Sequence, residues 1–457
     1  MKVPDLVVFR HAALPVSRHF LARRPLAVNI RAVAMLSSFK ARQQGAGAGT
    51  VYIAASFAAS GALTFAFQAI STRALGGAAG YAPVALLWSA VFLAVQVLWV
   101  AATQTLGRHV AEREARGEGC RPVVSSVRRW QGVLVAAFLL AALPAGPLLT
   151  EHVFGDAWLT AAFVAAVAFY APEYFRRGVF NGHRQPFRLG AQILAESSGR
   201  VLVAAVLLAL GWGVLGPALA IVLAPLVGFL AVGPASVAPP ERDGGPFGAA
   251  GAFRFAGPVL ACGAFAQALM NGGPILASVL GATDAQVGLL GAALVLTRVP
   301  QYVLTPAIGA LLPHASRILS AEGRAAFDRF VVGAVAAVGI IGMLMVGGTW
   351  LLGGWALRLF AGPGFEASRG VLVALAMLAA FYLVSETLNQ ALFALGRERL
   401  AALAWFVGLP VCAVCLAVLG TGIVERISYS LAIGALAAAA AQAICYLATR
   451  GRPGPRA

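Results

Sequence analysis

The stretch from Phe330 to Leu352, FVVGAVAAVGIIGMLMVGGTWLL, carries no charged residue and is long enough to cross a lipid bilayer as a helix. Eleven other stretches are similarly apolar, which gives twelve predicted spans: residues 49–71, 81–105, 130–150, 158–179, 189–210, 214–234, 255–279, 286–312, 330–352, 369–393, 400–420 and 427–447. Inside a bilayer every backbone polar group needs a partner within the protein, and these stretches lack the alternation of barrel strands. The sequence therefore predicts an all-α polytopic membrane protein.

The distribution of charge predicts how the chain lies in the membrane. Of the 457 residues, 60% are hydrophobic and only 11% are charged, against about 25% charged in soluble domains. The net charge of +17 would suit nucleic acid, but 28 of the 34 Lys and Arg fall in termini, loops and span ends on one side of the predicted membrane. This positive-inside pattern places both termini in the cytoplasm. We therefore interpret the charge as a topology signal that also attracts anionic lipid headgroups, and expect no nucleic-acid partner.

The composition also suggests an origin. Arginine far outnumbers lysine, which occurs only at Lys2 and Lys40, and Ala and Gly dominate. This is typical of a GC-rich bacterial genome, so we expect a multi-pass protein of the bacterial plasma membrane. Residues 1–47 are basic and lack the apolar stretch of a signal peptide. Three interpretations stay open for them: a disordered cytoplasmic tail, a basic amphipathic surface helix, and an upstream extension of a chain that starts at Met35.

Weak self-similarity links the first six spans to the last six. Residues 173–184, EYFRRGVFNGHR, end the fourth span, and residues 386–397, ETLNQALFALGR, end the tenth, with Glu, Phe and Arg matching at an offset of 213. Because each set has an even number of spans, we predict parallel repeats that enclose a cavity, which rocking exposes to alternate sides. The predicted parts are the bundles 48–234 and 254–448, the Pro- and Gly-rich cytoplasmic linker 235–253, and the cytoplasmic tail 449–457.

Several short motifs carry a resemblance to a known family. They are Ser71-Thr-Arg-Ala-Leu-Gly76, Gly80-Tyr81, Phe180-Asn-Gly-His-Arg184, residues 210–220 (LGWGVLGPALA) and residues 311–316 (LLPHAS). Together with the six-plus-six topology, over about residues 48–450, they make the chain resemble the multidrug/oligosaccharidyl-lipid/polysaccharide (MOP) exporter superfamily, and most of all its polysaccharide branch. The resemblance implies a MATE-like fold with twelve transmembrane helices.

The resemblance also implies a flippase. It would move an oligosaccharide on a polyprenyl pyrophosphate from the inner to the outer leaflet, for a polysaccharide such as lipopolysaccharide or exopolysaccharide, with polymerases and glycosyltransferases as partners. The alternatives are a cation-coupled multidrug antiporter, a lipid II flippase-like transporter of peptidoglycan precursors, and a scaffold that transports nothing. The first span has no acid between Val51 and Ile70. This disfavours drug antiport, because many cation-coupled exporters of the superfamily carry acids there.

Three arginines are candidates for holding the anionic headgroup, because ionisable groups inside a membrane are costly. Arg298, in the middle of the eighth span, could hold a pyrophosphate by paired hydrogen bonds or pair with a neighbouring acid or carbonyl. Arg73, at the outer end of the first span, could receive the headgroup late in the cycle or snorkel to the interface. Arg200 shares a helix face with Glu196, as a self-neutralising pair or as a proton-sensitive one.

Acids and amides complete the candidate site. Glu173 and Glu386 occupy equivalent positions in the two repeats and, together with Glu196, are candidates for coupling or gating. The alternative for Glu173 and Glu386 is a helix-end acid paired with a nearby arginine, at Arg176, Arg177 or Arg397. The amides that could bond sugar hydroxyls, or join helices, are Gln267, Asn271, Gln301, Asn389 and Gln390.

No enzymatic site is predicted. There is no Walker loop, and none of the six His pairs with an acid at metal-ligand spacing. Cys412 and Cys415 have redox spacing but lack the flanking context of a redox motif. We therefore expect neither a metal nor a cofactor.

Overall fold

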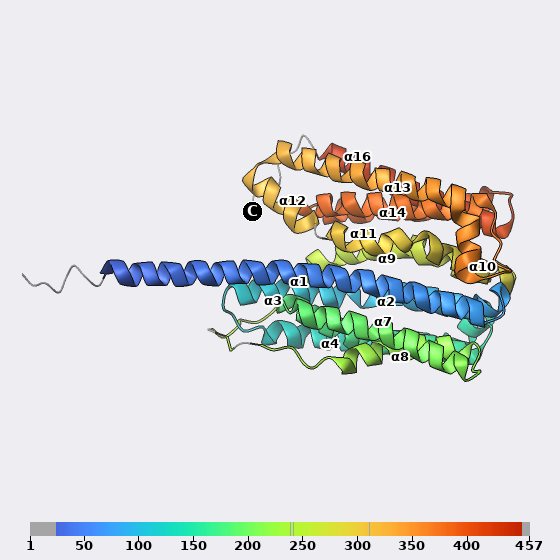
Figure 1. Ribbon diagram of the computed structural model, residues 1–457, viewed down its shortest axis with the longest axis horizontal. Helices are drawn as coiled ribbons and strands as arrows, with labels where there is room; N and C mark the ends of the chain where they lie inside the picture. Colours follow the sequence, from blue (N-terminus) through green and yellow to red (C-terminus); the bar gives the residue numbers. More distant parts are fainter. Residues whose placement is uncertain (1–23, 238, 241, 310, 450–457) are drawn as a thin grey trace, which may run out of the picture. The chain divides into compact units, whose positions relative to one another are not determined.

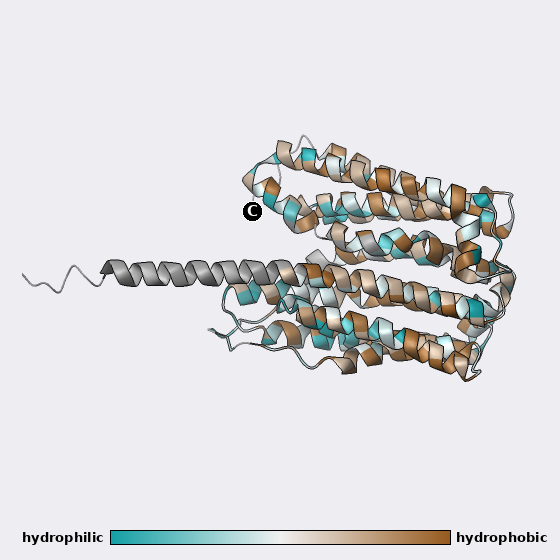
Figure 2. Cartoon of the chain, in the orientation of Figure 1, coloured by the Kyte–Doolittle hydropathy of each residue, from teal (hydrophilic) through white to brown (hydrophobic). Residues whose placement is uncertain are grey.

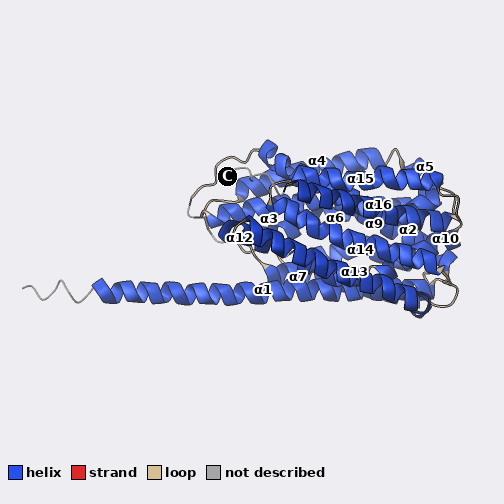
Figure 3. Cartoon of the chain, turned by 90° about the horizontal axis from the view of Figure 1, so that it is seen from above, coloured by secondary structure: helices blue, strands red, loops and turns tan. Residues whose placement is uncertain are grey.

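The computed structural model describes residues 24–237, 239–240, 242–309 and 311–449. Within these ranges the backbone consists of helices, turns, loops and one isolated β-bridge, as Figure 3 shows. The helices are α1 (Arg24–Ala74), α2 (Ala78–Leu98), α3 (Val100–Ala115), α4 (Arg121–Ala142), α5 (Gly146–Leu149), the π-helical turn η1 (Thr150–Phe154), α6 (Ala157–Gly182), α7 (Pro186–Ala209), α8 (Leu215–Ala231), α9 (Ala249–Val279), α10 (Asp284–Thr297), α11 (Val299–Gly309), α12 (Leu311–Ala321), α13 (Arg324–Ala361), α14 (Arg369–Ala394), α15 (Glu398–Val418) and α16 (Ile423–Ala448).

The chain divides into two compact units, Met1–Val51 and Tyr52–Ala457. In the first unit, residues 1–23 lie outside the described part of the chain, and the backbone is helical from Arg24 onward. The predicted basic tail therefore contains helix where it is described. The predicted C-terminal tail lies outside the description from residue 450 onward.

Most of the helices beyond Val51 are long enough to span a membrane. In the described residues, ten spans are sufficiently long and apolar when α2 and α3 count as one, and two shorter apolar helices, α8 and α10, stand at the sixth and eighth predicted spans. The all-helical polytopic fold is thus confirmed. Figure 2 shows apolar residues along α8 and α13. On α13, Leu344, Leu351 and Trp355 are exposed, as expected of side chains that face lipid.

The eighth predicted span differs from expectation, because residues 286–312 do not form one continuous helix. Helix α10 ends at Thr297, Arg298 follows with φ −93° and ψ −3°, and α11 begins at Val299. Pro300 accounts for the break, since proline has no N–H to donate within a continuous helix but is accommodated in the first turn of a new one. Arg298 therefore lies at a helix break and not in mid-helix.

Within the unit that begins at Tyr52, the rest of α1 with α2 to α8 forms one half, and α9 to α16 form the other (Figure 1). The same pairing recurs in both: α7 packs against α8 and α15 against α16, while α6 contacts α8 and α14 contacts α16. The end at which α1 turns into α2 is called the Arg73 side here. The opposite end, where residues 233–248 lead from α8 to α9, is called the linker side.

The two halves meet where α2 packs along α9 and α10. This close approach depends on glycine. A Cβ on Gly288 would collide with the carbonyl oxygen of Ala78, and a Cβ on Gly291 would lie 2.5 Å from the Cβ of Ala85. Small residues let the backbones of neighbouring membrane helices approach closely. The halves are therefore in tight contact near the Arg73 side.

Candidate functional site

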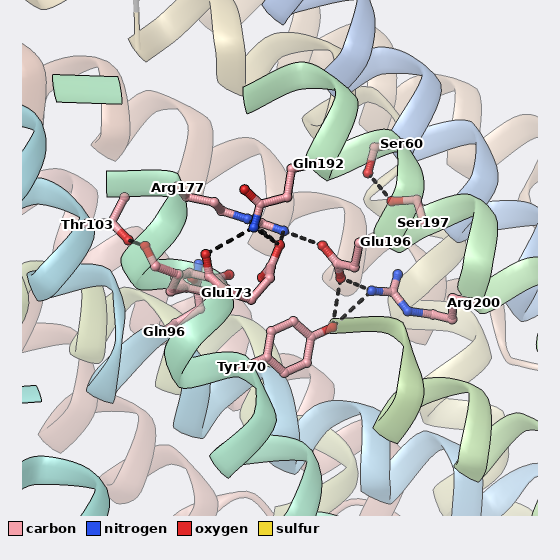
Figure 4. A network of polar contacts seen from close by, with 11 residues as sticks. Ser60, Gln96, Thr103, Tyr170, Glu173, Arg177, Gln192, Glu196, Ser197 and Arg200 are labelled. Atoms are coloured by element: carbon pink, nitrogen blue, oxygen red, sulfur yellow. Dashed lines mark hydrogen bonds and ion pairs between the residues drawn. The ribbon is translucent and has the colours of Figure 1, made fainter. Parts of the chain in front are cut away.

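A network of charged side chains lies inside the first half, between α6 and α7 (Figure 4). Arg177 donates to Glu173 over 2.8 Å and also bonds Glu196. Glu196 accepts a hydrogen bond from Tyr170 at 2.7 Å and forms an ion pair with Arg200. The two negative charges of the carboxylates are therefore neutralised by the two positive charges of the guanidinium groups.

This network is largely buried, with only Arg177 partly exposed, and it is tied to neighbouring side chains. Glu173 is fully buried and Arg200 is 2% exposed. Gln192 donates to the backbone oxygen and to Oε1 of Glu173, at 3.1 and 3.2 Å. Arg200 lies over the rings of Trp88 and Phe92 from α2, at 5.2 and 5.6 Å. Buried ions persist only when they are paired and hydrogen-bonded, so each charge in this network has its partners within the protein.

The pairings can be compared with the sequence predictions. Glu196 and Arg200 share a helix face and form an ion pair, as their spacing predicts. Glu173 pairs with Arg177, one of its predicted partners, whereas Arg176 donates to backbone carbonyls at the end of α8. The bond between Arg177 and Glu196 was not predicted from the sequence, because it joins two helices and no spacing rule connects them.

Arg298 lies in the second half in a different environment. It is 9% exposed, and no ion pair balances it among the described residues. Its Nη1 donates to Oδ1 of Asn271 at 2.9 Å, and Asn271 donates to Gln267 at 2.6 Å. The Nε and Nη2 groups are buried without a partner in the described part of the chain. These two groups form one edge of the guanidinium, a fork that matches two oxygens of a phosphate.

Glu386 on α14 is the counterpart of Glu173 in the predicted repeat. Unlike Glu173, it has no ion pair among the residues that the structure describes. It is half-buried and hydrogen-bonds Asn389. Tyr382, one turn earlier, interacts electrostatically with both Glu386 and Arg298 and hydrogen-bonds Gln267. Tyr382 was not among the residues predicted from the sequence. The sequence feature that could have identified Tyr382 is a polar phenol hydroxyl within an apolar span.

The two remaining candidate amides lie apart from this chain of contacts. Gln301 and Gln390 are both half-buried. The Oε1 atom of Gln301 is buried and finds no partner among the described groups. The structure therefore joins Arg298, Asn271 and Gln267 directly, and leaves Gln301 as a nearby acceptor on α11.

Arg73 bridges the two halves. Its guanidinium donates to the backbone oxygen of Phe360 at 3.3 Å and to that of Leu359. Both carbonyls belong to the last turn of α13, where a positive charge is favourable. Phe65 stacks on Phe360 beside this contact, with ring centroids 4.3 Å apart. In this conformation the exposed Arg73 side chain caps a helix of the other half.

Similar sequences occur in proteins whose own function is not assigned. No family model matches the chain. Uncharacterized proteins of Mycobacterium tuberculosis strain H37Rv and of Mycobacterium bovis are each 26% identical to it over 306 residues, which cover 64% of this chain and 69% of theirs. These similarities agree with the bacterial origin that the composition suggests.

Solved structures resemble the chain more fully. An inward-facing multidrug resistance MATE family transporter of the MOP superfamily matches with a TM-score of 0.69, at 16% identity, over 85% of this chain and 93% of that one. The fold is that of the MATE transporters. An outward-facing structure scores 0.62, at 14% identity, over 88% and 95% of the two chains. A Vibrio cholerae MATE transporter scores 0.60, at 15% identity, over 90% and 98%.

These matches confirm the predicted MATE-like fold. At such identities they define the fold alone.

Proposed function

We propose that this protein is an alternating-access flippase of the bacterial plasma membrane. It carries a polyprenyl-pyrophosphate-linked oligosaccharide from the inner to the outer leaflet, for assembly of a cell-surface polysaccharide. The observation that carries the proposal is Arg298: a buried arginine at a helix break, with two free N–H donors and no ion pair among the described residues. Burying a charge inside a membrane costs free energy, and residues that do so commonly serve a function.

The donors around Arg298 suit a phosphorylated sugar. The fork of Nε and Nη2 can bind two oxygens of a pyrophosphate, while Asn271 holds the other edge of the guanidinium. The amide of Gln267 and the phenol of Tyr382 lie beside it. Amides and hydroxyls of this kind can hydrogen-bond sugar hydroxyls. The polyprenyl tail would stay in the surrounding lipid.

The other charged candidates differ in whether they already have partners, and this suggests a different role for each. Arg200, Glu173 and Glu196 are engaged with one another in the first half, so we assign them to the framework of that half. Glu386 lacks an ion pair within the described chain, and we propose it as the acid that couples transport to an ion. Arg73 closes the Arg73 side and would be released for the headgroup only when the halves part there.

A second candidate function is cation-coupled drug export. It is favoured by one observation, that the matching solved structures include multidrug resistance transporters. Two features of this chain oppose it. Residues 51–70 contain no acid, and the unpaired positive charge of Arg298 would repel a cationic drug.

The discriminating experiment uses proteoliposomes of the purified protein. We would follow the leaflet accessibility of three fluorescent probes to an impermeant quencher: a polyprenyl pyrophosphate oligosaccharide, the same oligosaccharide on a neutral lipid, and a cationic dye. We expect protein-dependent movement of the pyrophosphate lipid alone. Dye exchange driven by a proton or sodium gradient, without lipid movement, would replace the flippase with a drug antiporter.

A further inference from the structure

The linker between the halves is fastened to one of them. We propose that residues 233–247 form a strap that moves as part of the first half, so that the chain pivots at Gly248, where α9 begins. The described residues of this strap are 233–237, 239–240 and 242–247. Each of its three sections contacts the first half, and the contacts involve backbone atoms of the strap as well as side chains.

The first section of the strap is held by α7 and the turn before it. Gln185 donates to the backbone oxygen of Ser236, and the Ser236 N–H donates back to Oε1 of Gln185 at 3.2 Å. Arg188 donates to the backbone oxygen of Pro234. A single amide side chain thus pairs with both polar groups of one strap residue, as a neighbouring strand would.

The middle section pairs with the loop between α3 and α4. Arg242 and Glu118 form a parallel β-bridge. The Gly119 N–H donates to the Arg242 oxygen at 2.9 Å, and the Arg242 N–H donates to the Gly117 oxygen at 3.1 Å. Gly244 lies so close to this loop that a Cβ on it would collide with the carbonyl oxygen of Gly119. The strap therefore adds one backbone rung to the first half.

Arg113 fastens the last section. Its side chain is largely buried, and it donates to the Gly119 oxygen at 3.0 Å and to the Gly245 oxygen at 2.7 Å, one on the loop and one on the strap. Phe247 packs edge-to-face on His109 of α3, with ring centroids 5.0 Å apart. Arg113 is thus a positioning residue that ties the loop and the strap together.

The connection ends abruptly at Gly248. This residue precedes α9 with an extended backbone, φ −80° and ψ 116°, and a Cβ on it would meet nothing within 4 Å. The strap up to Phe247 has partners on the first half, whereas Gly248 is the last residue before the second half. Rotation about this one residue would let the halves rock while the strap keeps its bonds.

The first test asks whether the strap is fastened, and it does not depend on transport. Trypsin cleavage after Arg242 is timed in intact protein in nanodiscs. We expect Gly244→Ala and Arg113→Ala to speed this cleavage about tenfold, because cleavage tracks the fraction of open strap. Gly245→Ala, the same change one residue later with open space around it, should leave the rate unchanged. Equal rates in all four proteins would overturn the strap.

The second test asks whether the strap moves with the first half, and it rests on the proposed flippase activity. In a protein with its native cysteines replaced, Glu118→Cys and Arg242→Cys are oxidised to a disulfide across the bridge. We expect transport to survive, whereas a short thiol cross-linker between Phe65→Cys and Phe360→Cys, across the halves, should stop it. Loss of transport on oxidation, restored by reduction, would overturn the shared motion. Absence of transport in the unlinked protein would count against the proposed function alone.

Discussion

Arg200 and Arg298 are both buried arginines within apolar helical segments, but only one of them has counter-charges. Arg200 bonds Glu196 and the hydroxyl of Tyr170, the latter at 2.9 Å. Arg298 has a single hydrogen-bond acceptor, Asn271, among the described residues. Breaking a buried ion pair costs about 3–5 kcal/mol, because it leaves the other charge buried and unpaired. Removing an unpaired charge leaves no such orphan.

This difference predicts opposite effects on stability. Arg200→Ala should lower the melting temperature markedly, since Glu196 would keep only Arg177 as a cation. Arg298→Ala should leave the melting temperature unchanged or raise it. Both are measured by thermal unfolding in the same detergent. A comparable loss in both variants would show that Arg298 is a structural residue, contrary to the proposed headgroup site.

At the scale of single residues, the sequence predicted local partners well. The spacing of Glu196 and Arg200 is enough to place them on one helix face, and the structure pairs them. Contacts between helices had no such signal. Tyr382 interacts with Arg298 because α14 packs beside the end of α10. Arg73 finds its two carbonyl acceptors because α1 ends beside the last turn of α13.

At the scale of helices, glycine decides which surfaces touch. Gly288 on α10 lies against the backbone of Ala78 on α2, whereas Gly347 on α13 has open space where a Cβ would stand. The two residues are therefore a matched pair for one substitution. Overpacking a tight contact costs typically about 1–3 kcal/mol, while alanine in an open helix position gains up to about 1 kcal/mol over glycine.

We accordingly expect Gly288→Ala to lower thermal stability and Gly347→Ala to preserve or raise it, again as melting temperatures in one detergent. The reason is steric, because the new methyl group must push α10 away from α2. If Gly288→Ala melted at the same temperature as the unmodified protein, the close approach of α2 and α10 would be wrong.

Apolar periodicity located the helices but not every interruption. The predicted span 286–312 counts only hydrophobicity, and both sides of Arg298 are apolar. The break between α10 and α11 depends on the backbone chemistry of Pro300, which a hydrophobicity pattern does not register. The predicted span 81–105 is also interrupted, at Trp99, where α2 ends before α3 begins.

At the scale of the whole molecule, Arg73 is a latch between the halves on one side of the membrane. Its two hydrogen bonds join α1 to the last turn of α13 in the other half. The internal repeat and the family resemblance predicted two bundles and a MATE-like fold, and solved structures bear out the fold. Neither could predict how the halves touch, because that depends on contacts between distant residues such as Phe65 and Phe360.

Arg73→Ala should therefore shift the protein toward the state that is open on the Arg73 side. A cysteine at Ala85, where α2 faces α10, would report the shift by its rate of labelling with an impermeant maleimide. We expect a rise of about tenfold, the effect of losing hydrogen bonds from a charged donor. Arg369→Ala is the control, since Arg369 lies over Trp350 of its own half. Equal labelling in both variants would contradict the latch.

The central claim is that Arg298 holds the headgroup during transport. The most direct measurement is the rate at which proteoliposomes flip a fluorescent polyprenyl pyrophosphate oligosaccharide, with the unmodified protein and with Arg298→Ala compared at equal protein content. We predict protein-dependent flipping that falls at least about tenfold in the variant, because the paired bonds to the phosphate are lost. Flipping by Arg298→Ala at the unmodified rate would contradict the account.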